Sequence, residues 1–219
     1  MKRKYILFDF DGVIADTEGS NTVFLGKALA LFGITLTKED IYSLTGNNGG
    51  EPLLKILERA VPPIEYEPFM AIRRSMGNTY ENGQLIPLPG IYELLENLKK
   101  AGIRMALVSS TSQRLIIRAL ERMNLTDYFE VVICGDTVSE HKPSPVPYHT
   151  AMGLLKAAPE ECIVIEDSEV GIRAGKASGA YVIGYRGSEL SQNTALADVS
   201  IDSYDELYNM DLGITWAAA

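Results

Sequence analysis

The 219-residue sequence holds only two cysteines, one tryptophan and two histidines, and it has fewer basic than acidic side chains. Twenty Lys and Arg against twenty-nine Asp and Glu give a formal net charge of −9. Such a chain repels polyphosphate backbones, so nucleic acid is not an expected partner. No apolar run reaches the roughly 20 residues of a membrane span, and Asp9 and Asp11 interrupt any secretory signal after the basic start. We therefore expect a cytoplasmic protein with no membrane segment. We also expect a monomer, although nothing in these patterns fixes the oligomeric state.

The two cysteines, Cys134 and Cys162, each lie in an apolar stretch and lack the CxxC spacing of metal and redox motifs. Buried free thiols are typical of proteins in a reducing compartment. We therefore expect no disulfide between these two residues, which agrees with the cytoplasmic location.

Short apolar runs rich in β-branched residues alternate along the chain with helical patterns. The runs predict buried strands at 5–10, 103–108, 131–134, 162–165 and 180–184. Apolar residues at helical spacing predict helices at 91–100, 113–123, 147–156 and 169–178. This alternation favours a Rossmann-like parallel sheet flanked by helices, so the fold class is α/β. A final helical return over the sheet is expected at 188–197 and 205–207.

Residues 17–82 break this rhythm, because they show amphipathic helices without a convincing strand. The helices are expected at 20–31, 38–44, 51–60 and 68–81. Polar or proline-containing segments flank this stretch on both sides. We therefore predict an all-helical domain, 17–82, inserted into a core domain formed by 1–16 and 83–219.

The first predicted strand ends in two carboxylates, Asp9 and Asp11, where open α/β sheets place their ligands. Two carboxylates two residues apart in an extended segment that leaves a strand can address one point. Their repulsion is costly without a cation, and a hard divalent ion such as Mg²⁺ would neutralise them. The alternative is a surface turn, since Asp11-Gly12 is a common turn dipeptide.

Polar residues also follow three later predicted strands. Ser109 to Ser112 can hold a phosphate through a hydroxyl and backbone N–H groups, or can cap a helix. Lys142 can supply a positive charge to a phosphoryl group, or can be solvated surface. Glu166-Asp167 can be a second carboxylate pair or an acidic helix cap. Capping alone does not require all four clusters, so together they favour a metal-assisted phosphate site.

In this order and spacing, the clusters resemble the motifs of the haloacid dehalogenase superfamily of aspartate-nucleophile phosphotransferases. The matching motifs are Asp9-Phe10-Asp11-Gly12-Val13, Val108-Ser109, Lys142-Pro143 and Glu166-Asp167. The helical insertion after the first motif is similar to that of the subgroup with β-phosphoglucomutases and sugar-phosphate phosphatases. The resemblance implies that the insertion is a cap domain that closes over the site.

The resemblance also implies a role for each matching residue. Asp9 would attack phosphorus to form an aspartyl phosphate, and Asp11 would act first as general acid and then as base. The implied metal is Mg²⁺, and its implied ligands are the Asp9 and Asp167 carboxylates and the Asp11 backbone carbonyl, with Glu166 nearby or acting through water. The implied phosphate-binding residues are Ser109 and Lys142, aided by N–H groups near Gly12 and Ser110.

Cap residues bear on the choice between hydrolysis and mutase chemistry. Where the mutase pattern has a His and an Arg, this sequence has Asn21 and Gly49. The candidate substrate contacts in the cap are Asn21, Asn47, Asn48, Arg73 and Arg74. The alternative for the arginines is a solvated helix face, and the alternative for the asparagine pair is a plain turn.

The prediction that results is hydrolysis of a small phosphomonoester, a sugar phosphate, in a Mg²⁺-dependent reaction. A phosphosugar mutase of the β-phosphoglucomutase type is the alternative. A second alternative is a non-catalytic phosphate-binding module. Such a module would be expected to have lost at least one motif, and this sequence has lost none. The expected partner is a small phosphorylated metabolite.

Overall fold

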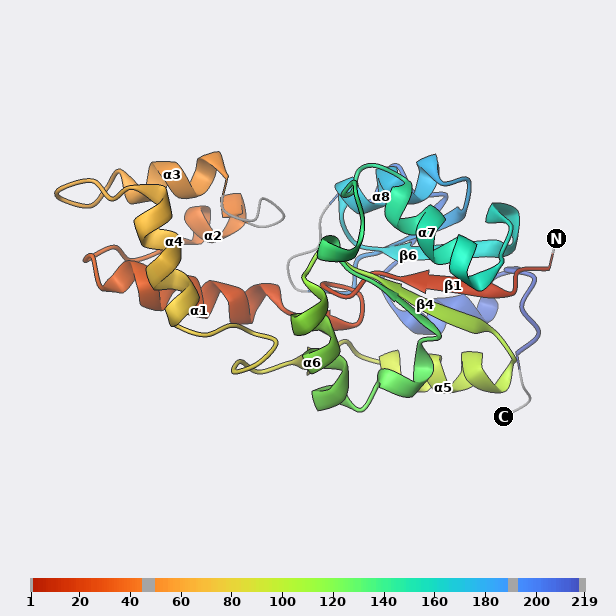
Figure 1. Ribbon diagram of the computed structural model, residues 1–219. Helices are drawn as coiled ribbons and strands as arrows, with labels where there is room; N and C mark the ends of the chain where they lie inside the picture. Colours follow the sequence, from red (N-terminus) through yellow and green to blue (C-terminus); the bar gives the residue numbers. More distant parts are fainter. Residues whose placement is uncertain (1, 45–49, 189–192, 217–219) are drawn as a thin grey trace. The chain divides into compact units, whose positions relative to one another are not determined.

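The computed structural model (Figure 1) describes residues 2–44, 50–188 and 193–216. The chain divides into two compact units. One unit combines Met1–Asp16 with Ile86–Ala219, and the other is Thr17–Leu85. We call them the core unit and the helical unit. None of the described helices has the length and apolar character that crossing a bilayer demands.

A six-stranded parallel sheet forms the centre of the core unit, with the order β5-β4-β1-β6-β7-β8. Its strands are β1 Tyr5–Phe8, β4 Arg104–Val108, β5 Val131–Ile133, β6 Cys162–Glu166, β7 Tyr181–Tyr185 and β8 Val199–Ile201. Strand β1 pairs with β4 on one side and β6 on the other, and all four of its residues are buried. Its unbroken apolar sequence is typical of a strand covered on both faces. The predicted parallel sheet is therefore confirmed.

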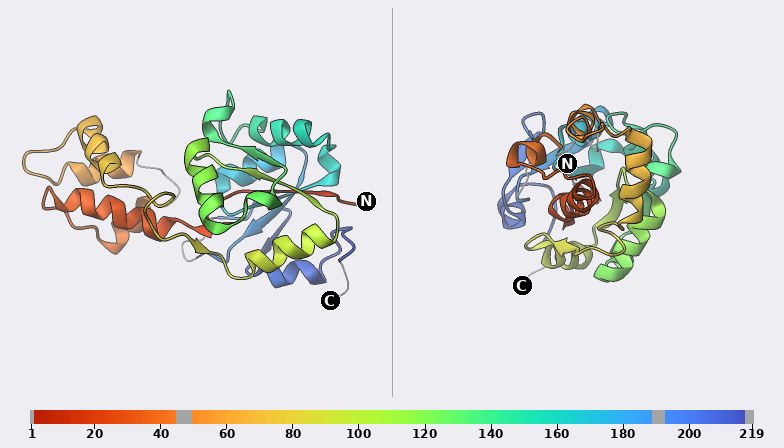
Figure 2. Two further views of the ribbon diagram at one scale, coloured as in Figure 1. Left: turned by 60° about the horizontal axis from the view of Figure 1, so that its bottom comes forward. Right: turned by 90° about the vertical axis from the view of Figure 1, so that its left-hand side faces the viewer.

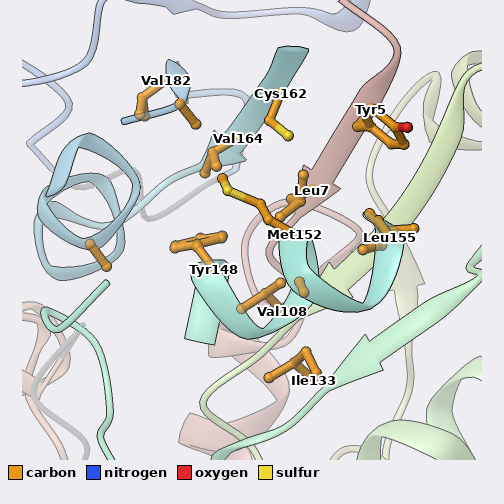
Figure 3. Packing of buried hydrophobic residues seen from close by; sticks show 14 of the residues in the cluster. Tyr5, Leu7, Val108, Ile133, Tyr148, Met152, Leu155, Cys162, Val164 and Val182 are labelled. Carbon is orange, nitrogen blue, oxygen red and sulfur yellow. The ribbon is translucent and has the colours of Figure 1, made fainter. Parts of the chain in front are cut away.

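Helices cover both faces of this sheet. They are α5 Ile91–Lys100, α6 Gln113–Met123, α7 Val146–Leu155 and α8 Glu169–Ala177. Figures 1 and 2 show α5 on one side of the sheet and α7 on the other. Figure 3 shows how Tyr148, Met152 and Leu155 of α7 pack with Leu7 and Val164 of the sheet. Residues three and four positions apart on α7 face the sheet, as an amphipathic helix requires.

The end of the core unit differs from the prediction. Strand β8 extends the sheet beyond β7 in parallel register, although no strand was predicted there. The predicted helix at 188–197 is wrong for 193–197, which are not helical, and 189–192 lie outside the described residues. The predicted helical segment at 205–207 is a short 3₁₀ helix, η4, which covers Tyr204–Asn209. Three residues are too few for the alternation of β8 to stand out in the sequence.

The chain leaves and re-enters the core unit through two very short strands. β2 (Ala15–Asp16) pairs antiparallel with β3 (Ile86–Pro87). The sequence did not predict this pairing, because two residues carry no periodicity. It places the two connections to the helical unit side by side on the core unit.

The helical unit has its own small core. Its helices are α1 Glu18–Ala30, α2 Lys38–Leu44, α3 Glu51–Leu57 and α4 Tyr66–Ser75, and no strand occurs in 17–44 or 50–85. Leu29, Leu53 and Phe69 are among its buried residues. The predicted helix 68–81 ends six residues early, since Gly77 has φ of +92° and turns the chain.

Candidate active site

The predicted catalytic residues of the core unit meet at the carboxyl ends of the sheet strands. Asp9 directly follows β1, Glu166 is the last residue of β6, and Asp167 follows it. All three carboxylates are buried, and Glu166 has no exposed surface. Lys142 comes from the segment after β5, and its side chain is 5% exposed. Three segments distant in sequence thus converge, as a parallel sheet with the carboxyl ends of its strands on one edge allows.

Lys142 sits between two of the carboxylates. Its ammonium nitrogen Nζ lies 2.7 Å from Asp9 Oδ1 and 2.7 Å from Glu166 Oε1. It also donates to the Val108 carbonyl oxygen at 2.9 Å. An ammonium group has three hydrogens, so these three contacts use all of them. The predicted phosphate contact of Lys142 therefore requires that one of these partners give way.

A candidate metal centre lies beside this lysine. Asp9, Glu166 and Asp167 each offer a carboxylate oxygen, and these oxygens lie within 4.8 Å of one another. Carboxylate oxygens are the ligands that Mg²⁺ prefers. With one lysine ammonium against these three buried carboxylates, a divalent cation would bring the charge close to balance. The residues present therefore fit a hard divalent ion.

The acidity of these groups reflects the crowding. Burial raises the pKa of Asp9 to about 8, with Lys142 opposing the shift and Glu166 and Asp11 adding to it. Burial also raises the pKa of Asp167 well above its usual range, and Glu166 adds to this. For Lys142, burial lowers the pKa, but Asp9 and Glu166 outweigh burial and raise it well above its ordinary value. The lysine is therefore held as a cation.

Both oxygens of Glu166 are surrounded by donors. Oε1 accepts from Lys142 and from the Tyr148 hydroxyl at 3.1 Å. Oε2 accepts from the N–H groups of Asp167 and Ser168, each at 3.1 Å, and from Ser168 Oγ. Ser168 also caps α8 by accepting from the Gly171 N–H. Ser168, and not Glu166, is therefore the residue that caps α8. Glu166 contacts Lys142 instead.

Glycine 171 gives Glu166 the space that it occupies. A Cβ atom at Gly171 would lie 1.6 Å from Glu166 Oε1. A second close approach involves Gly12, which has φ of +74° and whose Cβ would lie 1.9 Å from Asp167 Oδ2. The Gly12 N–H donates to the Ala15 carbonyl at 2.9 Å. In the structure Gly12 therefore packs against Asp167. For its N–H to bind a phosphate oxygen as predicted, the hydrogen bond to the Ala15 carbonyl would have to break.

The loop after β4 lies beside Asp11. Ser109 is buried, and its Oγ accepts from the Thr111 N–H at 3.0 Å, while Ser110 is exposed. The Thr111 hydroxyl donates to Asp11 Oδ2 at 3.2 Å. A Cβ at Gly135 would lie 2.2 Å from the Ser110 carbonyl oxygen, so the loop after β5 packs tightly on this one.

Sequence reasoning missed two side chains of this site. Thr111 was noted only within a run of hydroxyl residues, and its contact with Asp11 joins segments 100 positions apart. Tyr148 was predicted only as part of a helix. An aromatic residue at an apolar helix position is most often packing, so no local signal distinguished it.

The candidate cap residues make contacts inside the helical unit. Asn21 Oδ1 accepts from the Thr79 hydroxyl at 2.7 Å. Arg73 donates to the Gly77 carbonyl at 2.8 Å, and its guanidinium lies 5.5 Å from the Phe24 ring centroid. Arg74 is exposed and lies 4.0 Å from a Glu67 oxygen. Asn47 and Asn48 lie outside the described residues.

The comparisons with known proteins agree with this geometry. The sequence model of a family described as haloacid dehalogenase-like hydrolase matches residues 6–185. The chain belongs to this family. The predictions of the haloacid dehalogenase family, of its α/β core and of a hydrolase are therefore confirmed. Cys134 and Cys162 were predicted to be buried free thiols, and the structure has both as free and buried.

Several members of the haloacid dehalogenase family are similar over most of their length. Protein CbbY of Cereibacter sphaeroides is 32% identical over 213 residues, which cover 92% of this chain and 93% of the relative. A phosphorylated carbohydrates phosphatase of Thermotoga maritima is 31% identical, covering 80% and 81%. A crystal structure of a CbbY variant from Rhodobacter sphaeroides in complex with xylulose-(1,5)bisphosphate has a TM-score of 0.76 and 29% identity. It covers 94% of this chain and 96% of that one.

Proposed function

We propose that the protein is a Mg²⁺-dependent phosphatase that hydrolyses a small phosphomonoester, a sugar phosphate, through an aspartyl-phosphate intermediate on Asp9. One observation carries the proposal. The buried ammonium of Lys142 contacts Asp9 and Glu166, which form a cluster of three carboxylates together with Asp167. Phosphoryl transfer depends mainly on positioning and on neutralisation of charge, and this cluster suits both needs.

The proposed metal ligands are the Asp9 and Asp167 carboxylates and the Asp11 backbone carbonyl, with Glu166 beside them. When bound, Mg²⁺ supplies neutralisation of negative charge on Asp9 and on the phosphoryl group. The donor set supports this choice, because it offers only oxygen atoms.

The residues then divide the work of two displacement steps. In the first, an Asp9 carboxylate oxygen forms a bond to phosphorus while the bond to the leaving oxygen breaks, and Asp11 gives that oxygen a proton. In the second, Asp11 takes a proton from water as the water oxygen attacks phosphorus and the Asp9–phosphorus bond breaks. The Thr111 hydroxyl supports the orientation of Asp11. Ser109 and Lys142, with N–H groups near Gly12 and Ser110, are the proposed phosphate contacts.

The substrate class rests on the relatives and on the helical unit. One relative is named a phosphatase of phosphorylated carbohydrates, and a CbbY variant binds a sugar bisphosphate. We keep Asn21, Asn47, Asn48, Arg73 and Arg74 as the proposed substrate contacts of the cap. The cap domain of 17–82, its closure over the core, the monomer and the cytoplasmic location belong to the same proposal.

Mutase chemistry is the alternative that Asn21 disfavours. A mutase must keep water from the aspartyl phosphate and must bind a bisphosphate in two orientations. Asn21 has an amide in place of a titratable imidazole, and its oxygen is engaged by Thr79. Hydrolysis does not need that group.

The proposal is tested by measuring release of phosphate from a chromogenic aryl phosphate and from a panel of sugar phosphates. We expect turnover with Mg²⁺ that disappears with EDTA and in Asp9→Asn. Release of no phosphate from any substrate would contradict the proposal and favour the binding module. For the mutase, β-glucose 1-phosphate is supplied with a trace of the bisphosphate. Formation of glucose 6-phosphate faster than free phosphate would overturn the choice of hydrolysis.

A further inference from the structure

Tyr148 lies behind the catalytic cluster, on the first turn of α7, and has no exposed surface. Figure 3 shows it packed between α7 and the sheet together with Val108 and Val164. Its hydroxyl donates to Glu166 Oε1 at 3.1 Å. Lys142 Nζ lies 5.1 Å from the centroid of the same ring. Tyr148 thus touches the anion through its hydroxyl and the cation through its ring.

The place of the Lys142 ammonium depends on Glu166. Of the three groups that receive its hydrogens, the Val108 carbonyl is backbone, Asp9 is the proposed nucleophile, and Glu166 is a side chain that can rotate. The Asp167 and Ser168 donors hold one Glu166 oxygen, Oε2. The other oxygen, Oε1, is the one that Lys142 contacts. The Tyr148 hydroxyl, on helix α7, donates a hydrogen bond to this oxygen.

From this geometry we propose that Tyr148 is a positioning residue. Its hydroxyl holds Glu166 Oε1 so that the Lys142 ammonium stays shared between Glu166 and Asp9. The role rests on the proposed function, because positioning of Lys142 matters only if Asp9 reacts with a phosphoryl group. A buried tyrosine that serves packing alone would make the hydroxyl dispensable. Removal of the Tyr148 hydroxyl oxygen therefore distinguishes the two roles, because it should lower activity only if Tyr148 positions Glu166.

The Tyr148→Phe variant removes the hydroxyl and keeps the ring beneath Lys142. Tyr128→Phe is the matched control, because the Tyr128 hydroxyl donates to Glu96 Oε2 at the same 3.1 Å in another part of the core unit. We expect Tyr148→Phe to lower kcat about ten-fold, as loss of a hydrogen bond to a charged group does, with KM changed less than about two-fold. Tyr128→Phe should keep the wild-type kcat. A wild-type kcat for Tyr148→Phe would overturn the proposal.

A double-mutant cycle tests whether Tyr148 acts through Glu166. If it does, adding Tyr148→Phe to Glu166→Gln should change kcat less than about two-fold, because the two changes break one contact network. The same ten-fold loss in both backgrounds would contradict the proposal. A purely structural effect would act alike in both.

Titration with inorganic phosphate, followed by calorimetry in the presence of Mg²⁺, repeats this cycle without turnover. We expect Tyr148→Phe to weaken phosphate binding in the wild-type background and to leave it unchanged in Glu166→Gln. Equal weakening in both backgrounds, or no weakening in either, would overturn the proposal. A wild-type protein that binds phosphate but hydrolyses no substrate would count against the proposed function, and the binding cycle would still decide the role of Tyr148.

Discussion

Lys142 Nζ and Asp9 Oδ1 lie 2.7 Å apart, although the two residues are separated by 133 positions. Burial raises the pKa of Asp9 to about 8, and Lys142 acts against that shift. A carboxylate attacks phosphorus only when it is ionised, so a cation in direct contact favours the reactive form. In the proposed reaction, the same contact would keep the ammonium next to the phosphoryl group that Asp9 receives.

Gly171 is predicted to be intolerant of any side chain. The added methyl of Gly171→Ala would lie 1.6 Å from Glu166 Oε1, so the carboxylate and with it Lys142 would have to move. We expect kcat to fall at least about 100-fold, by analogy with loss of a group that stabilises transition-state charge. Steady-state kinetics measure the effect.

Gly153→Ala is the control for this substitution. Gly153 is also in a helix, and a Cβ there meets nothing within 4 Å. The control should keep full activity and gain about 0.5–1 kcal/mol in free energy of unfolding. Full activity of Gly171→Ala would show that catalysis does not depend on the observed position of the Glu166 carboxylate.

Thr111 is predicted to orient Asp11. Thr111→Val removes the hydroxyl that donates to Asp11 Oδ2 and keeps the shape of the side chain. We expect kcat to fall about ten-fold, the effect of one hydrogen bond to a charged group. Thr111→Ser keeps a hydroxyl and should retain most of the activity. Equal kcat values for the two variants would contradict the assigned role.

Mg²⁺ is predicted to stabilise the folded protein as well as to activate it. Ligand at 100 times its dissociation constant adds about 2.7 kcal/mol to the free energy of unfolding when only the folded state binds it. Thermal unfolding with and without Mg²⁺ measures this effect independently of turnover. Asp167→Asn removes one proposed ligand and should reduce the stabilisation, whereas Asp127→Asn, on an exposed 3₁₀ helix, should not. Stabilisation of the same size in Asp167→Asn would exclude Asp167 as a ligand.

Asp198 is predicted to lower the free energy of unfolding as the pH falls into the acid range. It accepts hydrogen bonds from Lys176 Nζ at 2.5 Å and from the Val182 N–H at 2.8 Å. Burial raises its pKa, but these contacts outweigh burial and hold the pKa below its ordinary value. The depressed pKa means that the stabilisation is complete above the unfolded-state pKa of about 3.9 and is lost as pH falls through the lower folded-state value.

The variant Asp198→Asn tests this dependence. At pH 7 we expect its free energy of unfolding to be about 1 kcal/mol below the wild-type value, since the pair is partly exposed. The difference should shrink as the pH is lowered below about 4. Urea titrations at several pH values provide the measurement. A difference that grows toward low pH would reverse the predicted sign.

The sequence predicted those parts of the fold that have long, regular patterns. The central strands, for example β1, are unbroken apolar runs, and helix α6 matches its predicted bounds, 113–123. Strand β8 and the β2–β3 pair are too short to show a period. Helix α4 ends early because Gly77 adopts a positive φ, and apolar spacing does not report that conformation.

The sequence also located the candidate site, because side chains at the ends of parallel strands share one edge of the sheet. Asp9, Lys142, Glu166 and Asp167 were found in this way. Their mutual contacts were not predicted, since the partner of Lys142 depends on packing between distant segments. Tyr148 escaped notice for the same reason, because only the tertiary structure brings its hydroxyl to Glu166.

The central claim is that Asp9 forms a covalent bond to phosphorus. A single turnover with Mg²⁺ and a hydrolysed sugar phosphate, stopped by acid at successive times and analysed by peptide mass spectrometry, measures this directly. The account predicts a transient phosphoryl group on the peptide that contains Asp9, sensitive to hydroxylamine, and none in Asp9→Asn. Substrate hydrolysis with the phosphoryl group on another residue, or undiminished hydrolysis by Asp9→Asn, would contradict it.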